Sequence, residues 1–319
     1  MDQESNMVET LQTPPVSPGP NQVTARPAHA AALRSYAIFV AILSLLFSRS
    51  LVALAGYALH STLDSYILLV PVIAVYLMRP RLRTTPVSPE RSIAGTTLFL
   101  VAACSALALL WSHGIFGWPG GENDQLTAAA FAYVSLVVAG GFFFVGSRWM
   151  SAMAFPIAFL YFLVPLPEAA VTFLENASQA ASAEAADLFF SVSAMPVLRD
   201  GYIFQMPGIT IRVAQECSGI HSSLVLFIAS LLCAQLFLKS PWRRALLILF
   251  IFPLGIVRNG FRIFVIGWLC THVGPHMIHH PIHHRGGPVF FVLSLIPLFF
   301  ILRWLWRGEM EHPRPAPTA

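Results

Sequence analysis

Charged residues are scarce in this sequence, and lysine is almost missing. Asp, Glu, Lys and Arg make up 11% of the 319 residues, against about 25% in soluble proteins, while 56% of the residues are hydrophobic. Lys239 is the single lysine, so the net charge of +4 comes from arginine. The mean hydropathy is +0.68. These values exclude an ordinary soluble domain, and membrane topology explains the arginine excess better than nucleic-acid binding does.

Strand-like alternation and cysteine clusters are also missing. Without period-two alternation in the apolar stretches, a transmembrane β-barrel is not expected. The four cysteines, Cys104, Cys217, Cys233 and Cys270, show neither metal-type spacing nor the pattern of a disulfide scaffold. Cys104 and Cys233 lie inside apolar runs, which is typical of cysteines that only pack.

Long apolar runs are what the sequence does contain. A helix needs about 20 apolar residues to span a bilayer. Eight candidate spans can be drawn, at about residues 36–54, 66–78, 93–111, 126–145, 152–164, 219–238, 245–269 and 288–302. The sequence therefore predicts an all-α, polytopic transmembrane helical bundle of about eight spans.

The segments between and around the spans differ in composition. Residues 168–196 are rich in Ala and carry Glu168, Glu175, Glu184 and Asp187, which are too polar for lipid, so they predict an amphipathic helix. Residues 197–213 alternate around two turn signals and predict a short hairpin before the sixth span. We expect a disordered cytoplasmic tail at 1–35, which is rich in Pro, Ser, Thr and Gln, a transmembrane domain at 36–305, and a cytoplasmic C-terminal tail at 306–319.

The basic residues alternate between the two sides of these spans. Most of them follow the second, fourth, sixth and eighth spans: Arg79, Arg81, Arg83, Arg91, Arg148, Lys239, Arg243, Arg244, Arg303 and Arg307. The positive-inside rule then predicts cytoplasmic termini. Residues 165–216 and 270–287 are expected to face outward, on one side of the membrane.

Cys217 is the first candidate for chemistry. It lies in the polar run R-V-A-Q-E-C-S-G-I-H-S-S, residues 212–223, which opens directly into an apolar run. At the N-terminus of a helix, free backbone N–H groups and the dipole lower a thiol's pKa and favour the nucleophilic thiolate. The alternative is a small buried cysteine that only packs.

The seventh span holds Arg258, Asn259 and Arg262 within an otherwise apolar run. A charged residue in a transmembrane helix costs roughly 2.5–3.5 kcal/mol, so a function is favoured over a structural ion pair or snorkelling. Arg262 lies 18 residues beyond Arg244, which at about 1.5 Å per residue predicts a position near the outer leaflet, level with Cys217. If Arg258 only pairs or snorkels, lysine should replace it.

Six of the eleven histidines fall in the loop 272–284. Such density would suit a metal site, for example a zinc site, but the spacings fit no tight ligand motif and no acidic residue accompanies them. We therefore predict no metal and no cofactor. One histidine next to the eighth span is instead expected to act as a general acid and base beside the cysteine.

Three motifs, in this order and at one membrane depth, resemble the exosortase/archaeosortase family. They are Cys217-Ser218-Gly219, Asn259-Gly260-Phe261-Arg262, and His283 followed by Gly287 and Phe290-Phe291. Supporting likenesses are Leu63-Asp64-Ser65-Tyr66, Pro165-x-Pro167 and Pro253. Two positions depart from the family pattern: Ile67 stands where a histidine is usual, and His284 doubles His283.

The resemblance implies a membrane-embedded cysteine protease or transpeptidase of the bacterial inner membrane, with an extracytoplasmic active site. Cys217 would be the nucleophile, Arg262 the oxyanion or substrate-positioning residue, and His283 the acid and base. Supporting or alternative positions are His284, Asn259, Arg258, Ser218 and Gly219. The partners would be exported proteins whose C-terminal sorting tail has a Pro-Glu-Pro-like (PEP-CTERM) motif, a transmembrane helix and a basic end.

Two other classes stay open from the residues alone. One is a non-enzymatic membrane transporter or metal-handling protein that uses the loop 272–284, and the other is a membrane acyltransferase with a cysteine intermediate. Transport is disfavoured because no inverted repeat is visible and the polar residues gather at one face of the membrane.

Overall fold

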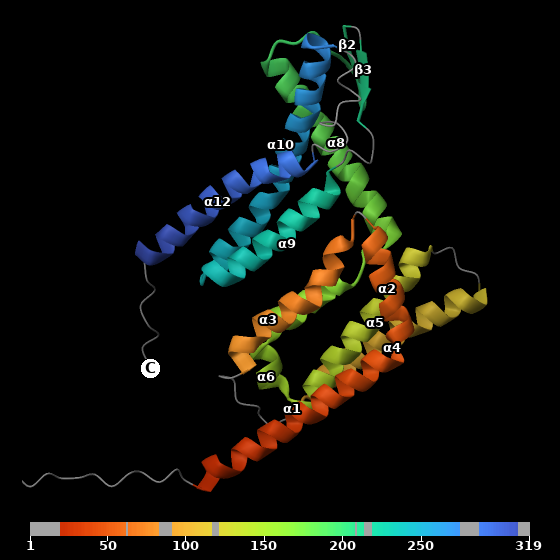
Figure 1. Ribbon diagram of the computed structural model, residues 1–319, viewed down its shortest axis with the longest axis vertical. Helices are drawn as coiled ribbons and strands as arrows, with labels where there is room; N and C mark the ends of the chain where they lie inside the picture. The colour runs from red at the N-terminus through yellow and green to blue at the C-terminus, as the bar shows by residue number, and fades with distance from the viewer. Residues whose placement is uncertain are drawn as a thin grey trace, which may run out of the picture. The chain divides into compact units, whose positions relative to one another are not determined.

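A computed structural model describes residues 20–61, 63–82, 91–116, 121–207, 209–213, 219–274 and 287–311 (Figure 1). The chain divides into two compact units. The first unit comprises Met1–Ala53, Leu69–Trp118 and Ala128–Val164, and the second comprises Leu54–Leu68, Pro119–Thr127 and Pro165–Ala319.

Most described residues are helical, and the long helices are apolar enough to cross a membrane. Six spans pass on length and composition: Ser65–Leu82, Ile93–Ser112, Glu122–Phe144, Ile220–Phe237, Pro241–His272 and Val289–Met310. Two further pairs of consecutive helices are long and apolar enough only when each bent pair is counted as one broken span. The described ranges then hold as many as eight candidate spans. The predicted all-α, polytopic transmembrane bundle is confirmed.

The first unit contains only helices in its described residues. Its elements are α1 (Pro20–Leu46), α3 (Val70–Leu82), α4 (Ile93–Phe116), most of α5 (Glu122–Phe144), α6 (Ser147–Ala152), α7 (Ala154–Phe159) and the 3-10 helix η2 (Leu160–Leu163). Polar side chains that donate to backbone carbonyls join these helices to one another. Tyr36 bonds to the Val137 carbonyl at 3.1 Å and Arg81 to the Ala152 carbonyl at 2.8 Å.

Three helix boundaries in this unit differ from the sequence-based expectation. The helix α1 begins at Pro20, inside the range predicted as a disordered tail, and proline suits the first turn of a helix because its missing N–H needs no partner there. The first predicted span breaks at Phe47, after which α2 (Ser48–His60) begins with Ser48 and Arg49, which interrupt the apolar run. The fifth predicted span, at residues 152–164, consists of two short pieces, α7 and η2, which follow α6 directly, instead of one helix.

The second unit combines, among its described residues, four long helices with a small sheet. The helices are α8 (Glu168–Val192), α9 (Ile220–Phe237), α10 (Pro241–His272) and α12 (Gly287–Glu311), and the 3-10 helix η1 (Ser65–Leu69) begins in this unit. The predicted amphipathic helix is therefore present as α8. The helix α12 continues past Leu305 to Glu311, so part of the predicted C-terminal tail is helical.

The sheet has one more strand than predicted. Strands β1 (Leu198–Asp200), β2 (Ile203–Met206) and β3 (Ile209–Arg212) form an antiparallel sheet in the order β1-β2-β3, with Phe204 opposite both Arg199 and Ile211. The predicted hairpin is present and a third strand extends it, because each of the two turn signals in this stretch separates its own pair of strands. Gly201, at φ 58°, turns β1 into β2.

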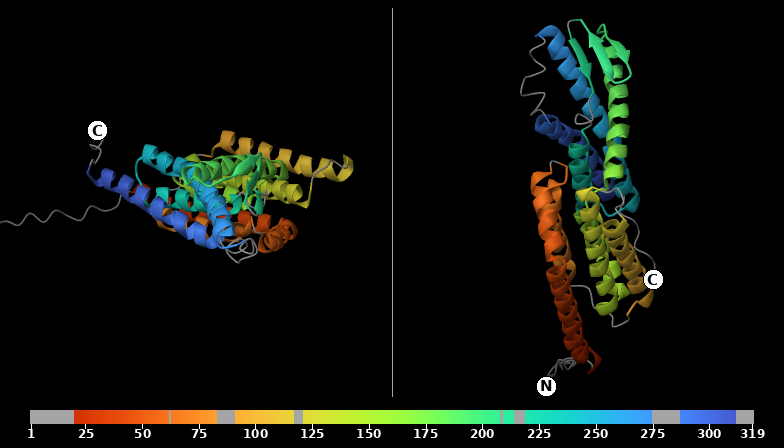
Figure 2. Two further views of the ribbon diagram at one scale, coloured as in Figure 1. Left: turned by 90° about the horizontal axis from the view of Figure 1, so that it is seen from above. Right: turned by 90° about the vertical axis from the view of Figure 1, so that its right-hand side faces the viewer.

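The sheet packs on the C-terminal ends of α8 and α10, and we call this assembly the head (Figures 1 and 2). Its buried core is Ala183, Ala186, Phe190, Phe204, Met206, Ile211, Val213, Ile263, Ile266 and Cys270. Gly260 lets α10 approach the backbone of α8, since a Cβ there would lie 2.5 Å from the Ala185 side chain. An open sheet edge is not tolerated in hydrocarbon, so we expect the head to lie outside the bilayer core, with the boundary near Arg262.

The ion pairs of the head lie on its polar surface. Arg199 on β1 bonds to Glu184 at 2.5 Å and to Asp187 at 3.3 Å, both on α8. The hydrogen bond to Glu184 raises the pKa of Arg199, so this guanidinium stays charged and joins the sheet to the helix.

Below the head, α9, α10 and α12 pack side by side. Their shared buried core is Leu226, Ala234, Leu238, Leu247, Ile251, Leu298 and Leu305. At the far end from the head, Glu309 accepts hydrogen bonds from the backbone N–H groups of Lys239 and Ser240, at 2.9 and 2.6 Å. The turn between α9 and α10 is thereby fixed to α12, so the three helices form one packed bundle next to the head.

Candidate active site

The predicted site residues fall into two groups. Cys217, Ser218, His283 and His284 lie outside the described residues. The rest of the predicted set, Gly219, Arg258, Asn259 and Arg262, is described and gathers where α9 begins beside the middle of α10.

Gly219 is the N-cap of α9 and has a left-handed backbone, with φ 71° and ψ 12°. A Cβ at this position would lie 2.9 Å from Asn259 Oδ1 and 3.3 Å from Arg258 Nη2. Both the backbone conformation and the space therefore require glycine. The chain turns here from the segment that carries Cys217 into the span.

Arg258 is buried, with 7% of its surface exposed. Its Nη2 donates to the Gly219 carbonyl at 3.1 Å and to Ser223 Oγ at 2.9 Å, while Nη1 is buried with no hydrogen-bond partner among the described residues. The guanidinium thus does not snorkel to the membrane surface. It joins the first turn of α9 to α10, and its charge is met by neutral acceptors in the part of the chain that is described.

Two polar residues of α8 complete the support of this turn. Ser182 Oγ accepts a hydrogen bond from Asn259 Nδ2 at 3.0 Å, and Gln179 Nε2 donates to the Val213 carbonyl at 2.5 Å. Val213 and Gly219 flank residues 214–218. The residue before this segment is therefore bonded to α8, and the residue after it is bonded to α10.

Arg262 lies one helical turn beyond Arg258, at the border between the head and the three-helix bundle. Its side chain is half-buried. Its depth near the outer leaflet stays a prediction from its distance to Arg244 in sequence. Whether it meets Cys217 stays a prediction, because that cysteine lies outside the described residues.

A segment distant in sequence approaches the first turn of α9. The Leu63 carbonyl lies 3.4 Å from His221 Nδ1. The neighbouring Asp64 is 2% exposed, and its Oδ2 accepts from Tyr57 at 3.1 Å and Ser61 at 3.0 Å. This is the Leu63-Asp64-Ser65-Tyr66 motif, which is thereby placed beside the site.

Sequence reasoning did not single out His221. It is exposed, it lies on the first turn of α9, and it follows Cys217 by four residues. If Nδ1 carries the proton and donates to Leu63, Nε2 is left to accept one, as a general base requires. The Cys-x-x-x-His spacing at a predicted helix start was the available signal.

The histidine loop is described only at its start. His272 stacks on Trp268, with ring centroids 4.7 Å apart, and its Nδ1 is 3.0 Å from the Trp268 carbonyl. The other loop histidines lie outside the described ranges. Within those ranges no group of three or more His, Cys, Asp or Glu side chains could hold a metal ion.

Comparison with protein families decides the identity. The model of the family described as transmembrane exosortase (Exosortase_EpsH) matches residues 58–300. The chain belongs to the transmembrane exosortase family. The comparisons with curated proteins and with solved structures found no match. Exosortase membership supports a membrane protease or transpeptidase that acts on exported proteins with sorting signals, and the apolar helices make the chain an integral membrane protein.

Proposed function

We propose that this exosortase cleaves a C-terminal sorting tail from exported proteins through a thioester on Cys217. The observation that carries the proposal is the double attachment of the cysteine-bearing segment, at Val213 and at Gly219, directly before the N-terminus of α9. A helix N-terminus favours a thiolate, and fixed residues on both sides of the cysteine's segment restrict where that thiolate can lie.

The proposed reaction has two steps. The thiolate of Cys217 attacks the scissile carbonyl carbon, forming a C–S bond and an oxyanion. The intermediate collapses to a thioester as the C–N bond breaks, and protonated His283 gives its proton to the leaving amine. Water or an acceptor amine then attacks the thioester, His283 takes the proton, and the thiolate leaves.

We assign Arg262 to the oxyanion. It lies near the membrane boundary, and a planar guanidinium in a low-dielectric site can stabilise a developing negative charge. Arg258 and Asn259 would act as positioning residues through Gly219 and Ser182. Ser218 and His284 are supporting candidates.

The proposed setting is the bacterial inner membrane, with the head and the site outward. The arginine-rich loops support this orientation, since Lys239 and Arg243 lie at the opposite end of α9 and α10 from the head. We propose residues 36–305 as the catalytic domain, flanked by terminal segments 1–35 and 306–319.

The test is cleavage of an exported reporter with a defined tail: a Pro-Glu-Pro motif, about 20 apolar residues and an arginine-rich end. Cys217→Ala and Cys217→Ser should both leave the reporter uncleaved on a gel at equal enzyme levels. Cys104→Ala, which removes an exposed cysteine of α4, is the matched control and should cleave normally. Hydroxylamine, which intercepts thioesters, should yield a C-terminal hydroxamate on the reporter. Full processing by Cys217→Ala would rule out the mechanism.

A further inference from the structure

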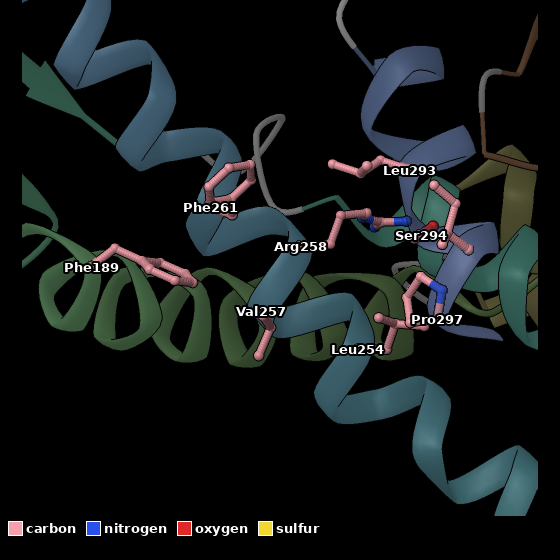
Figure 3. Close-up of a pocket in the computed structure, with 9 residues that line it drawn as sticks. Phe189, Leu254, Val257, Arg258, Phe261, Leu293, Ser294 and Pro297 are labelled. Atoms are coloured by element: carbon pink, nitrogen blue, oxygen red, sulfur yellow. The ribbon is translucent and has the colours of Figure 1, made fainter. Parts of the chain in front are cut away.

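A groove of about 280 Å³ runs between α8, α10 and α12 (Figure 3). Its walls are apolar side chains, among them Phe189, Val257, Phe261 and Ile296, while Arg258 and Ser294 supply its polar groups. Val257 and Ile296 are 50% and 51% exposed, so the groove is open along one side.

The depth of the groove follows from the head. Its upper end lies beside Phe189 and Phe261, next to the membrane boundary near Arg262, and its lower end lies at Leu254. From Phe261 to Leu254 is seven residues of helix, or about 10 Å. The groove therefore opens sideways into the outer part of the hydrocarbon region, where only an apolar occupant is stable.

Arg258 connects this groove to the site. It lines the groove, its side chain extends from α10 toward α12 in Figure 3, and its Nη2 bonds to the carbonyl of Gly219, two residues after Cys217. Whatever fills the groove is thus next to the turn that carries the nucleophile.

We infer that the groove receives the apolar segment of the substrate that directly follows the scissile bond. The inference rests on the proposed function, because a tail cleaved at Cys217 must continue from there into the bilayer. The apolar walls, the depth and the continuity with the site through Arg258 favour this segment over a phospholipid, which needs no contact with the site.

Filling the groove provides the first test. Val257→Trp places a large ring in the groove, and Val292→Trp makes the same change on α12 at a comparably exposed position that does not line it. With the tailed reporter, Val257→Trp should raise KM at least tenfold with kcat nearly unchanged, while Val292→Trp should match the wild type. Equal kinetics for the two variants would overturn the inference. Failure of the proposed function differs, since the wild type itself would then not cleave the reporter.

Photo-crosslinking tests the occupant without filling the groove. A benzophenone amino acid replaces Ile296, which lines the groove, or Phe299, which is 58% exposed and does not line it, in the Cys217→Ala background. Position 296 should crosslink to the apolar segment of the reporter, and position 299 should not. Crosslinks from position 296 to phospholipid alone, or equal reporter crosslinks from both positions, would overturn the inference.

Discussion

Arg258 on α10 donates a hydrogen bond to the carbonyl of Gly219, the residue on which α9 begins, across 3.1 Å. A cation inside a membrane span is therefore used to fix the backbone of a neighbouring span's first turn. Because Gly219 follows Cys217 by two residues, the contact links the middle of α10 to the proposed nucleophile.

Arg258→Lys is expected to lower kcat by about tenfold or more. The lysine ammonium keeps the charge but lacks the fork that bonds Gly219 and Ser223 together. Among the described residues Arg258 bonds only to neutral acceptors and is buried, so we expect that lysine does not replace it. Arg262→Lys should impair cleavage at least as severely, because the Arg262 guanidinium is the group that we assign to the oxyanion. Arg212→Lys, on the exposed edge of β3, is the control, and the measurement is reporter cleavage at equal enzyme levels.

Gly219→Ala should reduce both stability and cleavage. The left-handed backbone disfavours alanine by about 1 kcal/mol or more, and the added Cβ would press on Asn259. Gly56→Ala is the matched control: a Cβ there meets nothing within 4 Å, and alanine favours a helix interior. Thermal unfolding in detergent should show a lower midpoint for Gly219→Ala alone. An unchanged midpoint would mean that the turn is not held as described.

The histidines can be separated by single substitutions. His283→Ala should abolish cleavage, and His284→Ala should only weaken it. His221→Ala is the third variant, because His221 stands on the first turn of α9. If His221→Ala is inactive and His283→Ala retains cleavage, the role of acid and base belongs to His221.

Metal content tests the alternative function. Purified protein should hold zinc, copper and nickel only at substoichiometric levels, measured by plasma mass spectrometry. Joint replacement of His272, His276, His279 and His280 should leave reporter cleavage intact. A tightly bound, stoichiometric metal that is lost in this variant would favour a metal-handling protein instead.

The spans were predictable from the sequence because hydropathy over about 20 residues reports directly on the cost of exposing polar groups to lipid. The breaks within spans were harder to predict from the sequence. The interruption at Phe47 and the three pieces between Ser147 and Leu163 depend on local backbone geometry, which a hydropathy window averages away.

The sequence by itself determined the membrane class and the order of the motifs, since each depends on composition or on order along the chain. Only the tertiary structure decided which polar groups meet. The bonds of Arg258 to Gly219, of Asn259 to Ser182, and of Gln179 to Val213 join residues 34 to 77 positions apart. No periodicity encodes such pairs. They arise because α8, α9 and α10 converge on one turn, where buried polar groups are stabilised by hydrogen bonds to one another.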